Sequence, residues 1–408
     1  MTDSCATPGL HTVEQALEQI LQQLPKASGY QYLTLKHALS RVLYQDVIST
    51  INVPSFRNSS MDGYAIRFAD KPNTTFNIIG TSWAGRPFTK NIGENECVRI
   101  FTGAYVPDNA DCVVMQENIQ RIENTITIDK WPKQFENIRN IADDLKAGEV
   151  ILSQGTQLKA SDLGLLASTG IANISVFKSL TIGFFSTGDE LISIGSQPQL
   201  GQIFDSNRYT LYALLKELGA QPVDFGVIPD TPQAVENALL SASENCDVII
   251  TSGGASVGEA DYITSVLAKI GQVNLWKIAM KPGKPLIFGH INQRPFFGLP
   301  GNPVSVMVNF LQIVRPALLK MMGSQQEPPL LLQATTNTQI IKQPGRKEFQ
   351  CAIVQNINGQ LFVKPTIGQG SHILSSISQA NCLMVLEQES GNIDKGQTVN
   401  IQLLGKSI

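Results

Sequence analysis

The sequence has few of the residues that build a thiolate or imidazole metal site. Its 408 residues include only six cysteines and four histidines. The cysteines are scattered with no Cys-x-x-Cys pair, which argues against a zinc knuckle, an iron–sulfur cluster and a disulfide framework. The histidines lie at unrelated spacings, which disfavours a histidine-built transition-metal site. Reduced thiols in a cytoplasmic protein fit this pattern best.

The chain also lacks a basic block and a long apolar run. The net charge is −3 and neither half is strongly basic, so we expect neither nucleic acid nor an anionic membrane as a partner. No stretch of about twenty apolar residues is uninterrupted, and the N-terminus resembles no secretory signal. We therefore predict a cytoplasmic protein. Its length and its hydrophobic content of 42% predict several globular domains.

Residues 1–178 are predicted to form an N-terminal scaffold and dimerisation region with an inserted β module at about 52–140. From Thr12 the apolar spacing predicts an amphipathic helix that begins with a capping box and stops at Pro25. A second helix is expected from Leu33 to Leu43. After the module, further helical and strand patterns return the chain to the scaffold.

Residues 179–324 alternate between strand and helix patterns and predict a doubly wound, mostly parallel α/β domain. Residues 325–408 begin with a Gln- and Pro-containing linker and continue as short strands, with Asn358-Gly359 as a hairpin turn. The fold class is therefore multidomain, with a central α/β domain, a scaffold carrying a β module, and a C-terminal β domain.

The stretch from Asp247 to Ser305 carries the strongest sign of chemistry. A buried strand ends at a Gly-rich loop, where a ligand could approach backbone N–H groups at the carboxyl end of the strand. Lysines punctuated by prolines follow, and Asn302-Pro303 has the form of a helix start. Each part alone could be a structural turn, but together they predict a phosphate or oxyanion site.

Acidic residues recur where ligands bind in such a sheet. Glu190 follows the first strand, Asp230 the next, and Asp261 the Gly-rich loop. Helix capping would explain Asp230 by itself. Acids around a lysine cluster suggest instead a hard cation, such as magnesium, that bridges phosphate oxygens.

Two weaker signals lie in the inserted module. Asp62-Gly63 is either a hairpin turn or a functional carboxylate, and Thr102 beside a glycine is either a cap or a ligand contact. In the C-terminal domain, Arg346 and Ser371 could contact an anion or simply occupy loops. Asp143 and Asp144 are interpreted as a solvated turn.

These motifs together resemble the molybdopterin molybdenumtransferase (MoeA) family, which also includes the E domain of gephyrin. The resemblance covers nearly the whole chain. It rests on these strings: VPSFRNSSMDGYA, RIFTGA, FSTGDEL, TSGGASVGEADY, KIAMKPGKP and GLPGNPVS.

The resemblance implies that molybdate is inserted into adenylylated molybdopterin with magnesium-dependent release of AMP. It also implies a homodimer whose active site joins the α/β domain of one subunit to the β module of the other, and transient contact with the adenylyltransferase that supplies the substrate. The implied catalytic residues are Asp62, Thr102, Glu190, Asp230 and Asp261, of which the last three would hold magnesium. The implied substrate contacts are Ser252, Gly253, Gly254, Ser256, Gly258, Lys277, Lys281, Lys284, Pro300, Pro303, Arg346 and Ser371.

Two other functions remain open at this stage. A molybdopterin adenylyltransferase uses a similar α/β domain with a Gly-Gly loop, although the additional regions favour the molybdenumtransferase. A non-catalytic, gephyrin-like scaffold is the second alternative, and the absence of a fused domain or a long linker in these residues disfavours it.

Overall fold

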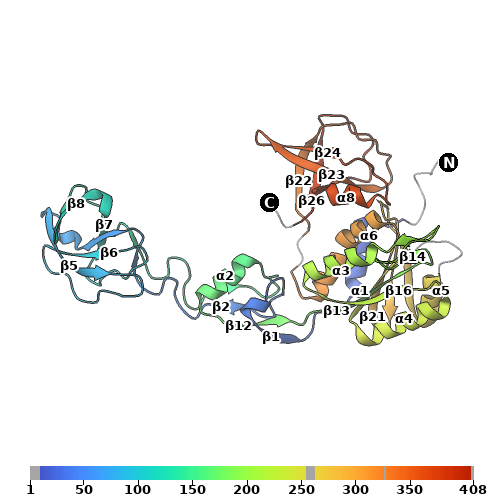
Figure 1. The fold of residues 1–408 in the computed structure, drawn as a ribbon, viewed down its shortest axis with the longest axis horizontal. Coiled ribbons are helices and arrows are strands. Elements are labelled where there is room, and N and C mark those ends of the chain that lie inside the picture. The colour runs from blue at the N-terminus through green and yellow to red at the C-terminus, as the bar shows by residue number, and fades with distance from the viewer. Residues whose placement is uncertain (1–9, 254–261, 326–327, 406–408) are drawn as a thin grey trace.

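The computed structural model describes residues 10–253, 262–325 and 328–405 and shows an elongated molecule (Figure 1). A small β module lies at one end of the long axis. A scaffold forms the middle, and the α/β and C-terminal domains lie together at the other end. This architecture confirms the predicted multidomain fold class.

The α/β domain is built on a six-stranded sheet. Four neighbouring strands are parallel, and the last two add an antiparallel edge. In spatial order the strands are β16 (Gln221–Ile228), β13 (Thr181–Thr187), β17 (Val248–Ser252), β21 (Arg294–Leu299), β20 (Pro285–Ile291) and β18 (Gly271–Lys277).

Helices cover both faces of this sheet because successive strand residues point to opposite sides. Ile182 and Phe184 face one core, whereas Phe185, the next residue along the strand, faces the other. The first face is covered by α1 (Val13–Gln23), α3 (Asn207–Leu218), α6 (Pro303–Asn309) and α7 (Arg315–Met321), and the second by α4 (Pro232–Asn245) and α5 (Tyr262–Ile270).

The helix from Pro303 to Met321 is long and apolar enough to cross a membrane by length and composition alone. It consists of α6, a π-helical turn (Phe310–Val314) and α7. Two thirds of its apolar window (67%) is buried inside the protein. Its apolar character is therefore that of a core helix, which packs against the sheet and α1.

Helix α1 confirms the predicted capping box, since Thr12 Oγ1 accepts from the Gln15 N–H and Gln15 reaches back to the Thr12 N–H. The helix predicted from Leu33 to Leu43 is wrong. Leu33 lies in strand β1 (Tyr30–Thr34), and only a short 3₁₀ turn (Leu35–His37) follows. Strand β1 pairs with β12 (Asn173–Phe177). This tertiary pairing overrides the helical spacing of the apolar residues.

The rest of the scaffold consists of short elements that join the β module to the α/β domain. Strand β2 (Val47–Ile48) pairs with β11 (Val150–Leu152), and helix α2 (Ala160–Ser168) packs over them. Just beyond this pair the two connecting chains run together as a narrow neck, where Val53 pairs with Leu145 (Figure 1).

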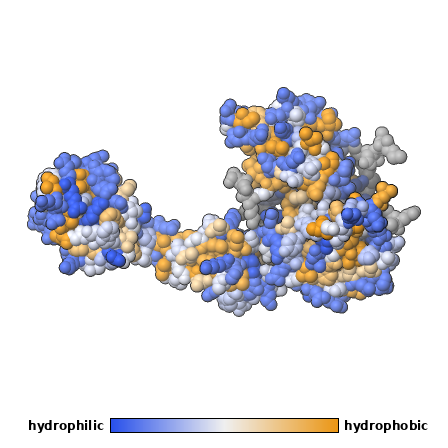
Figure 2. Space-filling view, viewed as in Figure 1, coloured by the Kyte–Doolittle hydropathy of each residue, from blue (hydrophilic) through white to orange (hydrophobic). Residues whose placement is uncertain are grey.

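The β module has its own six-stranded sheet and its own two apolar clusters. Figure 2 shows it as a separate lobe on a thin connection. The sheet order is β7 (Cys112–Met115), β4 (Gly63–Ile66), β6 (Glu96–Ile100), β5 (Thr75–Ser82), β9 (Thr125–Ile128) and β8 (Ile119–Ile122), with β3 (Asn58–Ser59) pairing with β10 (Ile138–Arg139) beside it.

The C-terminal domain is a curled sheet in which β23 pairs with β25 as well as β24, closing a barrel-like core. Asn358 and Gly359 both have positive φ (52° and 83°), which confirms the predicted hairpin turn. The strands are β19 (Met280–Lys281), β22 (Leu331–Thr336), β23 (Lys347–Ile357), β24 (Gln360–Pro365), β25 (Cys382–Leu386) and β26 (Thr398–Leu403), with helix α8 (Leu374–Gln379).

Candidate active site

A cavity of about 940 Å³ lies where the α/β and C-terminal domains meet. Its floor is formed by the carboxyl ends of β13, β17 and β21, which is where ligands bind in parallel sheets. Its other wall comes from the start of β23 and the loop before α8. The cavity is therefore large enough for a substrate of nucleotide size and is open to both domains.

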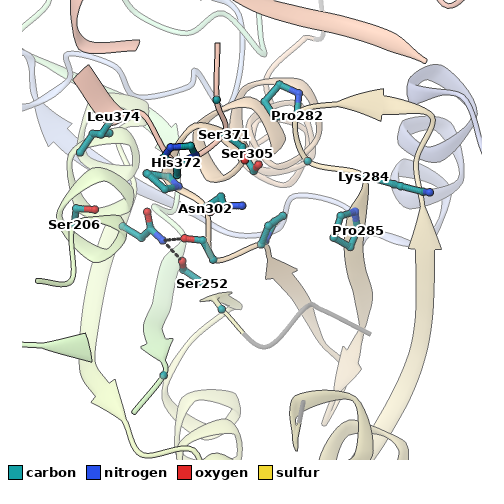
Figure 3. A pocket seen from close by; sticks show the side chains of 18 of the residues that line it. Ser206, Ser252, Pro282, Lys284, Pro285, Asn302, Ser305, Ser371, His372 and Leu374 are labelled. Atoms are coloured by element: carbon teal, nitrogen blue, oxygen red, sulfur yellow. Dashed lines mark hydrogen bonds between the residues drawn. The ribbon is translucent and has the colours of Figure 1, made fainter. Parts of the chain in front are cut away.

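Many of the predicted residues line this cavity, although they come from distant parts of the sequence. From the α/β domain these are Glu190, Asp230, Ser252, Gly253, Lys281, Lys284, Pro300 and Pro303, and from the C-terminal domain Arg346 and Ser371. Figure 3 shows Ser371 beside the start of α6, where the Val304 N–H donates to the Ser371 carbonyl (3.0 Å).

Lys281 is held at the edge of the cavity by a carboxylate that the sequence analysis did not identify. Its Nζ lies 3.3 Å from Glu348 Oε1, and the second oxygen of Glu348 accepts from Gln350 Nε2 at 2.9 Å. The Glu348 side chain is only 5% exposed, whereas that of Lys281 is 50% exposed. The ammonium group is thus fixed by a buried acid and still faces the cavity.

The acidic side of the cavity is formed by Glu190 and Asp230. Burial, together with the negative charges of Asp189 and Glu190, raises the pKa of Asp230 above its ordinary value. Asp189 Oδ1 also accepts from the Asp230 N–H, at 3.2 Å. A group of carboxylates that repel one another is a favourable place for a cation.

This acidic side fits a hard cation that substrate phosphate would help to hold. Within the described ranges, no three His, Cys, Asp or Glu side chains form a metal cluster by themselves. Magnesium commonly takes one or two protein carboxylates and completes its shell with phosphate oxygens and water. Glu190 and Asp230 supply that number of carboxylates.

Asn207 organises the floor of the cavity, and the sequence analysis missed it. Its Nδ2 donates to Ser252 Oγ and to the Gly301 carbonyl, both at 2.7 Å (Figure 3, dashed lines). It thereby joins the end of β17 to the loop after β21. The sequence signal that could have identified Asn207 is its position, as a polar residue at the start of a helix that follows Asp205.

Close backbone contact explains why glycine occupies position 253. Its φ is +91°, and a Cβ there would lie 2.5 Å from the Thr187 carbonyl oxygen. Among the described residues, Thr187 Oγ1 and Asn207 Oδ1 are buried polar atoms without a hydrogen-bond partner. Unpaired polar atoms beside a cavity are the type of group that a bound ligand satisfies.

Several predicted residues do not meet at this cavity. Lys277 ends β18 as an exposed residue, and it is not among the cavity-lining residues in the described part of the chain. Gly254, Ser256, Gly258 and Asp261 lie outside the described residues.

Asp62 and Thr102 lie in the β module, at the far end of the molecule from the cavity (Figure 1). They contact each other directly, because Asp62 Oδ1 accepts from both the Thr102 N–H and the Thr102 hydroxyl at 2.8 Å. These hydrogen bonds lower the pKa of Asp62, with a smaller contribution from the positive charge of Arg99. Asp62 is therefore a fixed, ionised carboxylate.

Two of the structural alternatives for predicted site residues are wrong. Asp62-Gly63 is not a hairpin turn, since β3 pairs with β10 while β4 pairs with β6 and β7. Asp230 does not cap α4. Thr231 does, accepting from the Ala234 N–H at 3.3 Å. Neither a hairpin turn nor helix capping therefore explains these two carboxylates.

The chain matches three family descriptions in order. These are the MoeA N-terminal region (domain I and II) over residues 11–170, the probable molybdopterin binding domain over 183–320, and the MoeA C-terminal region (domain IV) over 333–404.

Named relatives match over nearly the full chain. The molybdopterin molybdenumtransferase of Haemophilus influenzae is 45% identical over 395 residues, covering 96% of this chain and 98% of the relative. Gephyrin of Dictyostelium discoideum is 34% identical and covers the same share of this chain, but only 62% of gephyrin is matched. The crystal structure of the molybdopterin biosynthesis moeA protein from Pyrococcus horikoshii OT3 superposes with a TM-score of 0.81 at 28% identity, over 97% of this chain and all of that one.

Proposed function

The chain belongs to the MoeA family, and on that premise we propose that it is a molybdopterin molybdenumtransferase that inserts molybdate into adenylylated molybdopterin and releases AMP. The single observation that carries the proposal is the cavity between the α/β and C-terminal domains, where cationic and acidic side chains face one space. Relatives that carry the name molybdopterin molybdenumtransferase support this activity.

The two sides of the cavity suit the two kinds of charge in this reaction. Molybdate is a small dianion, and Lys281, Arg346 and the Ser371 hydroxyl supply charge-assisted and neutral donors for it. The substrate phosphates would lie toward the end of β17, where Gly253 allows close backbone approach. Catalysis then consists mainly of positioning and electrostatic stabilisation.

Magnesium is the cofactor we propose for the acidic side, held by Glu190 and Asp230 with Asp261 as the third candidate. When bound, it would polarise the phosphoanhydride that is cleaved. The two described carboxylates would hold the cation, while the cationic side chains would hold the leaving and incoming oxyanions.

We further propose a homodimer in which the β module of one subunit completes the cavity of the other. Asp62 and Thr102 form a hydrogen-bonded pair that lies far from the cavity of its own chain. The scaffold also exposes an apolar cross-strand pair, Ile48 (52% exposed) and Val150 (51%), and Figure 2 shows apolar surface between the two lobes. Such surface is typical of subunit contacts.

Purified protein incubated with adenylylated molybdopterin, magnesium and molybdate tests this function. We expect release of AMP and formation of a cofactor that reconstitutes a molybdenum-free apoenzyme. A second reaction supplies molybdopterin, ATP and magnesium. Adenylylation there, without AMP release in the first reaction, would assign the chain to the adenylyltransferases and overturn the proposal.

We also propose a cytoplasmic location and transient contact with the adenylyltransferase that hands over the substrate.

A further inference from the structure

An exposed tryptophan lies in the same row of the β-module sheet as Asp62. The register pairs Gly63 with Ile100 and Ile100 with Ser82. Asp62 precedes Gly63, Phe101 follows Ile100 and Trp83 follows Ser82, so these three residues continue the row at the end of the sheet. Phe101 stacks on Trp83, and the adjacent Thr102 donates two hydrogen bonds to Asp62.

The Trp83 ring is held flat by a stack of groups beneath it. The indole lies parallel to the Phe101 ring, with 4.2 Å between centroids and 11° between planes. The Arg99 guanidinium lies 4.7 Å from the Phe101 centroid and 5.0 Å from that of Tyr64. Arg99 is itself fixed by donating to the Gly63 carbonyl and to Gln116 Oε1. The ring is therefore pre-ordered before any ligand arrives.

Burial does not account for this arrangement. The Trp83 side chain is 51% exposed, while Trp131, in the same module, packs against Phe68 and Phe76. The backbone of Trp83 forms a tight turn by exchanging hydrogen bonds with Arg86, which requires no particular side chain. An exposed, rigid aromatic face beside a fixed carboxylate is the usual form of a platform for a planar ring.

We propose that Trp83 is a substrate-positioning platform on which a planar nitrogen heterocycle of the substrate stacks, beside Asp62. This inference rests on the proposed function, whose substrate carries two such rings, the pterin and the adenine. The platform binds the ring through its π-face and leaves the phosphate groups to the cavity of the partner subunit. It contributes binding energy, and it takes no part in bond cleavage.

Kinetics of Trp83→Leu and Trp83→Phe in the full-length protein test the platform. For Trp83→Leu we expect KM for adenylylated molybdopterin to rise about tenfold or more, with kcat nearly unchanged. Trp83→Phe should restore most of the affinity because it keeps an aromatic face. Ile122→Ala, which removes an exposed apolar side chain of the same module at another edge, is the matched control.

Intrinsic fluorescence provides a reading that does not depend on turnover. AMP and a soluble pterin, pterin-6-carboxylate, are titrated separately into the wild type and into Trp83→Phe. The ring that stacks on Trp83 should quench wild-type emission and leave the variant unchanged, and this identifies which heterocycle is held.

The proposal is overturned if neither compound quenches Trp83 emission and KM is unaffected. It is also overturned if Trp83→Leu lowers melting temperature, kcat and dimer content together without rescue by Trp83→Phe, because that result assigns a structural role. Absence of AMP release by the wild type would instead contradict the proposed function, and the quenching would still decide whether the platform exists.

Discussion

At the scale of single residues, the cavity combines charges that would repel substrate with charges that attract it. Glu348 is a buried carboxylate on the wall that must receive an anion, yet it is paired with Lys281 at 3.3 Å. A carboxylate in that position holds the ammonium group still and neutralises part of its charge before the anion binds. The Lys281–Glu348 pair therefore contributes a fixed position for the ammonium group more than it contributes net positive charge.

Replacing Lys281 by alanine is expected to lower kcat/KM about 100-fold or more, because a fixed donor to the oxyanion is lost. Because Lys281→Ala leaves the buried Glu348 carboxylate without its ion-pair partner, the free energy of unfolding should fall by about 1–3 kcal/mol. Adding Glu348→Gln should recover that stability without recovering activity. Steady-state kinetics and urea denaturation measure both quantities, and Lys395→Ala is the exposed control. A normal kcat/KM for Lys281→Ala would show that Lys281 does not bind the oxyanion.

Asp230→Asn is expected to raise stability and weaken magnesium binding. Because the pKa of Asp230 is raised, the folded protein holds this proton more tightly than the unfolded chain does. Its ionised form therefore opposes folding, and the cost grows as pH rises through the folded pKa. The variant should melt higher than wild type at neutral pH without metal, and the difference should vanish below the unfolded pKa of about 3.9.

The same variant should bind magnesium about tenfold more weakly, or worse. Calorimetry with magnesium and melting curves at neutral and acidic pH measure these effects, with exposed Glu149→Gln as control. Equal melting temperatures at neutral pH would show that Asp230 carries no electrostatic cost.

At the scale of elements, local signals predicted the parts of the fold that local contacts determine. The capping box of α1 and the Asn358-Gly359 turn depend on hydrogen bonds and dihedral angles within a few residues, so the sequence shows them directly. The helical spacing of the apolar residues from Leu33 to Leu43 gave a wrong prediction, because the structure of this segment depends on pairing with β12, about 140 residues away. Glu348 and Asn207 were missed for the same reason, since their partners are remote in sequence.

In the Asp62-Gly63 pair, close packing between strands explains why the second residue is glycine. A Cβ at Gly63 would lie 1.9 Å from the Val114 carbonyl oxygen of the neighbouring strand. We expect Gly63→Ala to destabilise the β module by about 1–3 kcal/mol or more, because the strands must separate. Calorimetry should show a lower transition for the module while the remaining domains keep theirs.

Gly164→Ala is the matched control for this substitution. Gly164 lies in α2, and a Cβ there meets nothing within 4 Å. Alanine should stabilise that helix by up to about 1 kcal/mol. If the Gly63→Ala protein melted as wild type does, close strand packing would not be the reason for glycine at this position.

At the scale of the whole molecule, the extended shape separates the Asp62–Thr102 pair from the cavity, so a dimer with a shared site makes a distinctive prediction. Asp62→Ala and Lys281→Ala should each be inactive as homodimers. When the two are unfolded and refolded together, mixed dimers contain one site with both changes and one with neither. About a quarter of wild-type activity should return at equal mixing.

If both residues instead acted within one chain, every site in the mixed dimer would carry one change and no activity would return. Mixing each variant with itself is the control for refolding, and AMP release is the readout. The experiment separates the two arrangements without requiring a structure of the complex.

The narrow neck has a consequence for how the sequence of this protein can evolve. Both connecting chains pass through one point, where Val53 pairs with Leu145. Among the residues that the structure describes, the two apolar clusters of the module contain none from outside residues 54–141. The remaining clusters contain none from inside that range. Half of the proposed site is thus a cassette, which recombination could exchange between relatives as a unit, altering substrate choice while the cores on both sides of the joint stay whole.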